Sequence, residues 1–116
     1  MRVARLENAD GRVVCGRCLV ADHWWLRMRG LLGKSSLDQD EGILLRPAGS
    51  IHMMFMRFAI DAVFCDRELI VLDVVRGLRP WRAAGRRGAK VVIELAEGAA
   101  AGVQAGDHLV LATIEP

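Results

Sequence analysis

Short apolar runs separated by turn residues follow one another along almost the whole chain, and this alternation constrains the fold more than any other feature. The runs are rich in Val, Ile, Leu and Phe, whereas Gly, Pro, Asp or Asn stands between them. Runs of this length and composition are typical of β-strands joined by turns. The predicted strands are residues 2–8, 12–20, 42–46, 51–56, 60–65, 69–75, 90–95 and 108–114.

The segments between these strands divide into tight turns and longer connections. Asp10-Gly11 is a hairpin-turn signal, and residues 66–68 (DRE) predict a second short turn. Residues 76–88 (RGLRPWRAAGRRG) contain one proline and three glycines. This composition predicts a long irregular connection.

One helix is expected in the N-terminal half. In residues 22–33 (DHWWLRMRGLLG) the apolar side chains recur at helical spacing, Asp22 suits the N-cap and Gly33 suits the C′ position. The predicted fold class is therefore α+β and β-rich. We expect a barrel-like mixed or antiparallel sheet of about seven strands, with this short helix packed on it.

Length and composition predict a single domain over residues 1–116. The chain has 116 residues and 53% hydrophobic residues, enough for an ordinary core. No apolar run approaches the roughly 20 residues of a membrane helix, and charged residues interrupt the first 20 positions, so we expect a soluble cytoplasmic protein. Three cysteines give no disulfide framework.

Residues 50–61 (SIHMMFMRFAID) place three ionisable side chains, His52, Arg57 and Asp61, among mostly apolar neighbours, where a charge is costly unless it is paired. In an extended strand, His52 and Met56 lie on one face, and Arg57 and Asp61 lie on the other, about 13 Å apart. A bend near 58–59 would be needed for Arg57 and Asp61 to pair. A helix would place the two at i, i+4, but the apolar runs that follow favour the strand.

Five motifs in this chain agree in order and spacing with one family. The motifs are "WWLRMRGLLG" (24–33), "SIHMMFMRFAIDAVFCDRELIV" (50–71), "LRPWR" (78–82), "VIELAEG" (92–98) and "AGDHLV" (105–110). They resemble small bacterial and archaeal proteins catalogued as domain of unknown function 192, over about residues 20–112. Two positions depart from the family pattern: Ala59 replaces its usual proline, and Ala48 stands where a cysteine often occurs.

The resemblance implies a compact β-rich domain and a common surface built from these motifs, but no reaction. We expect a cleft in which an anionic or carboxylate-bearing ligand, or a segment of a protein partner, binds to arginines beside a tryptophan. The favoured function is a small binding or accessory module without a cofactor. The predicted binding residues are His52, Met56, Arg57, Asp61, Arg79, Trp81 and Arg82.

A hydrolytic enzyme is the first alternative, with His52 as general base and Asp61 orienting it. The nucleophile would be Ser50, Cys65 or a water. No nucleophile elbow, glycine-rich phosphate loop or pair of metal-binding carboxylates accompanies them, so no catalytic residue is assigned. A protein-interaction domain without a small-molecule pocket is a further alternative.

Nucleic acid and membranes are not the expected partners. Residues 76–90 carry Arg and Lys around Trp81 with no acid among them, which resembles a nucleic-acid contact. The formal net charge is only +2, however, and a solvated arginine-rich loop is the preferred interpretation of the segment. Glu94 and Asp107, the other acids of the motifs, are expected to pair with an arginine or to cap.

No metal ligand is assigned. Cys15 and Cys18 form a Cys-x-x-Cys, but on a regular strand thiols three positions apart point to opposite faces, and they are expected to be packing residues. A zinc site that adds Cys65 and either His23 or His52 stays open as an alternative.

Copper is a second alternative for a metal. The pattern His52-x-Met54-x-Met56 offers soft ligands for Cu(I). Methionine is also a common core filler, and this second interpretation is preferred.

Overall fold

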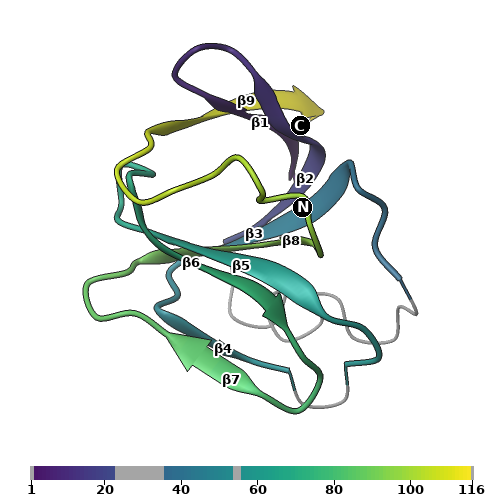
Figure 1. Cartoon of the computed structure of the whole chain (residues 1–116). Helices are drawn as coiled ribbons and strands as arrows, with labels where there is room; N and C mark the ends of the chain where they lie inside the picture. The colour runs from purple at the N-terminus through teal and green to yellow at the C-terminus, as the bar shows by residue number, and fades with distance from the viewer. Residues whose placement is uncertain (1, 23–35, 54–55, 116) are drawn as a thin grey trace.

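The computed structural model describes residues 2–22, 36–53 and 56–115, which form nine β-strands in two sheets (Figure 1). Seven strands make one sheet in the order β6-β5-β8-β3-β2-β1-β9, and β4 and β7 make the other. The strands are β1 (Arg2–Asn8), β2 (Val13–Ala21), β3 (Glu41–Leu45), β4 (Ser50–His52), β5 (Ile60–Cys65), β6 (Val71–Leu78), β7 (Ala83–Gly85), β8 (Val91–Ala96) and β9 (Leu109–Glu115).

Both tight turns predicted from the sequence are confirmed. β1 and β2 form an antiparallel hairpin, and Gly11 in its turn adopts a φ of 85°, which a glycine reaches without strain. β5 and β6 form a second antiparallel hairpin. The Asp66 carboxylate stabilises that turn by accepting hydrogen bonds from the amides of Glu68 (2.9 Å) and Ile70 (3.0 Å).

The large sheet buries apolar side chains on both faces. One face packs against the small sheet, which lies below β5 and β8 in Figure 1, and Ile51 and Met53 point into this layer. Residues 99–103 cover the other face through Ala100 and Val103. Because β5 and β8 are buried along their whole length, their sequences are apolar on both faces except for Asp61 and Glu94, rather than alternating.

The large sheet is strongly curled, so that its two outermost strands meet at one point. Ile70 and His108 form an isolated antiparallel bridge between the start of β6 and the start of β9. The Leu109 amide donates to the Leu69 carbonyl at 2.9 Å, and the Val71 amide donates to the Asp107 carbonyl at 2.8 Å. This contact joins the edges locally without continuing into a ladder.

The predicted α+β class with a barrel-like sheet is wrong. The described residues form strands only, and their sheet is not a closed barrel. Among these residues, none lies in a helix that could cross a membrane. The predicted helix over 22–33 lies outside the described residues except for Asp22. The sequence argument for a barrel was the need to protect sheet edges, which the bridge between β6 and β9 meets only at one point.

Two strand predictions also need correction. The segment 76–88 is not wholly irregular, because β6 continues to Leu78 and β7 occupies 83–85. The strand predicted over 51–56 ends at His52, and the chain bends at Phe58 before β5 begins. Of the positions between these strands, 54–55 lie outside the described residues.

A β-bulge overturns the expectation that Cys15 and Cys18 point to opposite faces. Leu6 pairs with Cys15 and Ala4 pairs with Cys18, so between these pairs one residue of β1, Arg5, opposes two of β2, Gly16 and Arg17. The extra residue turns both thiols to the same side of the sheet. Both are fully buried in the same apolar cluster.

Glu94 is a carboxylate placed in the middle of an apolar face. It lies between Ile43 of β3 and Ala62 of β5 on the side that faces the small sheet, and it is only 9% exposed. No described residue forms an ion pair with it, so the arginine partner expected from the sequence is not found there. Burial raises the pKa of Glu94 from the ordinary 4.5 to about 7.

We predict that Glu94 makes the protein less stable as the pH rises. The folded state keeps the proton up to about pH 7 whereas the unfolded chain loses it near 4.5, so stability present below pH 4.5 is lost as the pH rises through 7. The shift corresponds to about 3 kcal/mol. Urea unfolding between pH 4.5 and 8 measures it.

The Glu94→Gln variant is the control, because it keeps the shape and removes the titration. Between pH 4.5 and 8, the unfolding free energy of the variant relative to that of the parent protein is expected to rise by about 3 kcal/mol. Parallel curves for the two proteins would show that Glu94 is ionised in the folded state.

Candidate functional site

The small sheet brings together two of the segments that the sequence singled out. β4 and β7 pair antiparallel, with His52 opposite Ala83. The pairing continues beyond the strands: the Met53 amide donates to the Arg82 carbonyl at 2.7 Å, and the Trp81 amide donates to the Met53 carbonyl at 2.8 Å. The His52 segment and the turn at 79–82 therefore lie side by side, as the predicted cleft requires.

Trp81 is the most unusual residue of this region. Its φ of 69° lies in the left-handed region, which bulky side chains rarely adopt. Its side chain is nevertheless 63% exposed, so no core packing explains the conformation. An exposed aromatic residue held in a strained backbone conformation is a feature of recognition sites more than of structural turns.

The two segments that form this region contain several arginines and one lysine but no acidic residue. Residues 46–60 and 74–93 contain no Asp or Glu. None of the cations named below forms an ion pair with a described residue. The exposed cations of the two segments are Arg57, Arg76, Arg79, Arg82, Arg86, Arg87 and Lys90. Arg79 and Arg82 precede β7, and Arg86 and Arg87 follow it. We call these four arginines, together with His52 and Trp81, the β4–β7 surface.

Met56 and Arg57 lie just beyond β4. Met56 is half-buried and packs against the apolar layer between the sheets, and its amide donates to the Met53 carbonyl at 3.2 Å. Arg57 is exposed. Met56 thus contributes to packing. Arg57 is an exposed cation in the connection from β4 to β5, and it forms no ion pair with a described residue.

Asp61 lies apart from the other predicted site residues. It belongs to β5, where Ile60 and Ala62 face the small sheet, whereas Asp61 points to the opposite face of the large sheet. It is 1% exposed. Its carboxylate accepts from the amides of Gly77 (3.0 Å), Gly98 (3.0 Å) and Ala100 (3.1 Å). No described interaction joins it to Arg57 or His52.

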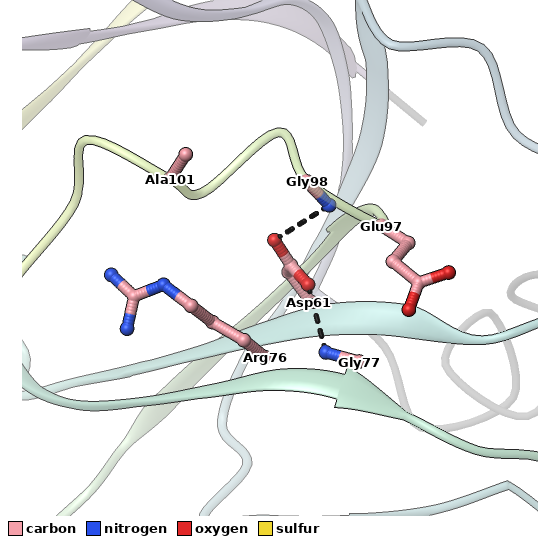
Figure 2. Close-up of a pocket in the computed structure, with 6 residues that line it drawn as sticks. All are labelled: Asp61, Arg76, Gly77, Glu97, Gly98 and Ala101. Atoms are coloured by element: carbon pink, nitrogen blue, oxygen red, sulfur yellow. Dashed lines mark hydrogen bonds between the residues drawn. The ribbon is translucent and has the colours of Figure 1, made fainter.

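A pocket of about 380 Å³ opens beside Asp61 on that opposite face (Figure 2). Arg76 and Glu97 project on its two sides, and the amides of Gly77 and Gly98 turn toward the Asp61 carboxylate. Arg76 is itself engaged: its guanidinium donates to the carbonyls of Ala100 (3.2 Å) and Val103. Asp61 and Arg76 thus both bind the backbone of the 97–103 segment.

The described residues contain no cluster of three or more His, Cys, Asp or Glu side chains that could hold a metal ion. Met54, which the copper alternative requires, and His23, one of the two histidines offered for the zinc alternative, lie outside the described residues. The thiols of Cys15, Cys18 and Cys65 are buried and free. The geometry of the described part therefore adds no support to a zinc or a copper site.

Sequence reasoning left two features of these sites unassigned. Arg86 and Arg87 follow β7 as Arg79 and Arg82 precede it, but no strand was predicted there to relate the two pairs. The role of Asp61 as an acceptor for three amides depends on two glycines with positive φ, Gly77 and Gly98. Those glycines were the available signal, since such positions often bring backbone amides close to an acceptor.

The profile of one family matches residues 5–111, which is most of the chain. It is domain of unknown function 192, described as an "Uncharacterized ACR". The chain belongs to this family. The resemblance drawn from the five motifs is thereby confirmed.

Two archaeal relatives support the assignment. A UPF0127 protein of Thermococcus sibiricus is 36% identical over 98 residues, which are 80% of this chain and 63% of that protein. A UPF0127 protein of Pyrococcus abyssi is 48% identical over 46 residues, 39% of this chain and 38% of that protein. This chain therefore spans less than two thirds of either relative, and neither name states an activity.

Two crystal structures share the fold at low sequence identity. A protein of unknown function from Novosphingobium aromaticivorans superposes with a TM-score of 0.79 at 21% identity, over 93% of this chain and 83% of that one. A Sinorhizobium meliloti protein, provisionally named a transcription regulator, gives 0.81 at 22% identity, over 95% and 92%. These structural similarities support the fold of this chain and carry no information about its function.

We predict that Asp61→Ala lowers the free energy of unfolding by about 3–5 kcal/mol. Three backbone amides lose their acceptor in this variant, and the alanine side chain cannot replace it. Urea unfolding at constant pH measures the loss. Asp107→Ala is the matched control, since Asp107 accepts one exposed amide, that of Gln104 at 3.0 Å, and should cost about 1 kcal/mol or less. Equal losses for the two variants would contradict a central structural role for Asp61.

Proposed function

We propose that this protein is a small binding module that recognises a carboxylate-bearing segment of a partner through the β4–β7 surface. The observation that carries the proposal is Trp81, 63% exposed at a φ of 69°, between two arginines and beside His52. Arginine binds carboxylates in a bidentate manner, and an exposed tryptophan supplies flat apolar area at little conformational cost.

The shape and charge of the surface favour a segment over a small molecule. Small-molecule sites are concave and mostly apolar, whereas His52, Trp81 and Arg82 are exposed around a short, two-stranded sheet. Arg86 and Arg87 extend the row of cations past the far end of β7. An extended acidic peptide can meet cations at both ends of β7, which a single small anion cannot reach.

A hydrolytic function is less well supported. The pair that it needs would join His52 to Asp61, but Asp61 lies on the opposite face of the large sheet with both carboxylate oxygens bonded to backbone amides. Such a carboxylate has no free geometry with which to orient a base. We therefore assign no catalytic role to either residue.

The proposal is tested by titrating ¹⁵N-labelled protein with a penta-glutamate peptide and following the amide and indole resonances. We expect shifts concentrated at the amides of His52, Trp81 and Arg82. Arg82→Ala should weaken binding by roughly tenfold or more, since a charge-assisted contact contributes about 1.5–3 kcal/mol. Trp81→Ala should also weaken binding, because it removes the apolar contact area. Arg12→Ala is the matched control, because Arg12 is an exposed arginine in the turn between β1 and β2.

A penta-lysine peptide and a short duplex DNA complete the design. Shifts with DNA that exceed those with penta-glutamate and fall steeply with salt would replace the carboxylate proposal by nucleic-acid binding. Equal weakening by Arg12→Ala would reduce the effect to non-specific charge attraction. Absence of any shift at the β4–β7 surface would overturn the proposal.

A further inference from the structure

The bulge in β2 creates a close pair of thiols that the proposed function does not use. Cys15 and Cys18 oppose Leu6 and Ala4, which are two positions apart on β1. Their Cα atoms are thereby brought to roughly 6.6 Å along the strand, at the upper end of the roughly 4.4–6.8 Å range of disulfides. Both side chains are buried on the same face.

Asp40 builds and maintains this bulge. Its carboxylate accepts from the Gly16 amide at 2.8 Å, and its carbonyl accepts from the Arg17 amide at 2.9 Å. The first bond is a side-chain contact to the residue that follows Cys15, and the second begins the parallel ladder between β2 and β3, where Arg17 pairs with Glu41. A side chain at position 16 has no room, because a Cβ there would come within 2.3 Å of the Asp40 carboxylate. The arrangement is thus specified by residues outside the strand.

The two thiols have different chemical character. A side-chain interaction between the two cysteines lowers the pKa of Cys15 and raises that of Cys18, to which burial adds. The Cys18 thiol itself donates to the carbonyl of Leu19 at 3.9 Å. The Cys15 sulfur also lies 3.5 Å from the carbonyl of Asp40, and Asp40 is exposed. Cys15 is therefore the more nucleophilic thiol of the pair, placed directly beneath a surface turn.

We propose that Cys15 and Cys18 are an oxidation site, a dithiol that closes to an intramolecular disulfide when it meets a low-molecular-weight disulfide. The Cys15 thiolate attacks one sulfur of the oxidant, so that a mixed disulfide forms and one small thiolate leaves. Cys18 then gives up its proton and attacks the Cys15 sulfur, which releases the second small thiolate. The pair loses two electrons, and the oxidant gains them and takes up the two protons as two thiols.

Cys65 provides an internal comparison. It is buried in the same apolar cluster, but it stands alone on β5. Burial and the neighbouring Asp66 carboxylate raise its pKa to about 12. Strands β8 and β3 separate it from β2 and the other two thiols, so it has no partner within the distance of a disulfide. A general susceptibility of buried thiols would affect all three cysteines, whereas the proposed site involves only two.

The test is to incubate the reduced, folded protein with oxidised glutathione and to map the products. We expect the number of free thiols, measured after denaturation, to fall from the three of the reduced protein to one. Trypsin cuts at Arg17, between the two cysteines, so the disulfide should appear as peptide 13–17 linked to the peptide that begins at Cys18. A reducing agent should separate them.

Three variants make the result decisive. Cys65→Ala should keep the linked peptides, whereas Cys18→Ala should stop at a mixed disulfide of glutathione with Cys15. Cys15→Ala should react much more slowly, because it lacks the nucleophile of the first step. Retention of all three thiols, a link to Cys65, or a linkage that forms only in urea would overturn the proposal.

Discussion

The Asp61 carboxylate is the interaction on which the rest of the structure depends. It is a carboxylate buried on one face of β5, next to the edge strand β6, and it is stable there because three backbone amides, from Gly77, Gly98 and Ala100, donate to it. Arg76 binds the same 97–103 segment from the carbonyl side. Together they fix the segment that covers one apolar face, and they hold the bulge at the end of β6, where Gly77 leaves the regular ladder.

β5 therefore serves two sides of the molecule at once. On one face Asp61 holds the cover of the core, and on the other face Ile60 and Ala62 form part of the floor beneath the small sheet. The small sheet carries His52 and, through the backbone of Met53, the turn with Trp81. Asp61 and the proposed β4–β7 surface thus lie on opposite sides of one strand, although Asp61 and His52 belong to a single twelve-residue stretch of sequence, 50–61.

The parts of the fold that depend on local chemistry could be predicted from the sequence. The 60–75 hairpin is predicted by two apolar runs and by Asp66 between them, whose carboxylate accepts hydrogen bonds from amides of the same turn. The parts that depend on distant partners could not. β7 reads Ala-Ala-Gly, which has weak strand propensity, and it is a strand because Ser50–His52 pairs with it. Likewise, the bulge at Gly16 needs Asp40, and the Asp61 site needs amides up to 39 positions away. The sequence thus identified most of the candidate residues, but not which faces they share.

The pairing of β1 with β9 has a consequence for how the chain is made. The side chains of Arg2 and Thr113, joined across these strands, lie 111 positions apart. On a ribosome, the β1–β2 hairpin emerges early with one edge unpaired, and that edge waits for nearly the whole domain to be synthesised. Contacts of such sequence separation slow folding, and an open strand edge is a site of association between chains. The interval before β9 arrives is therefore the period in which the nascent protein is most exposed to aggregation, and in which a chaperone would have most to protect.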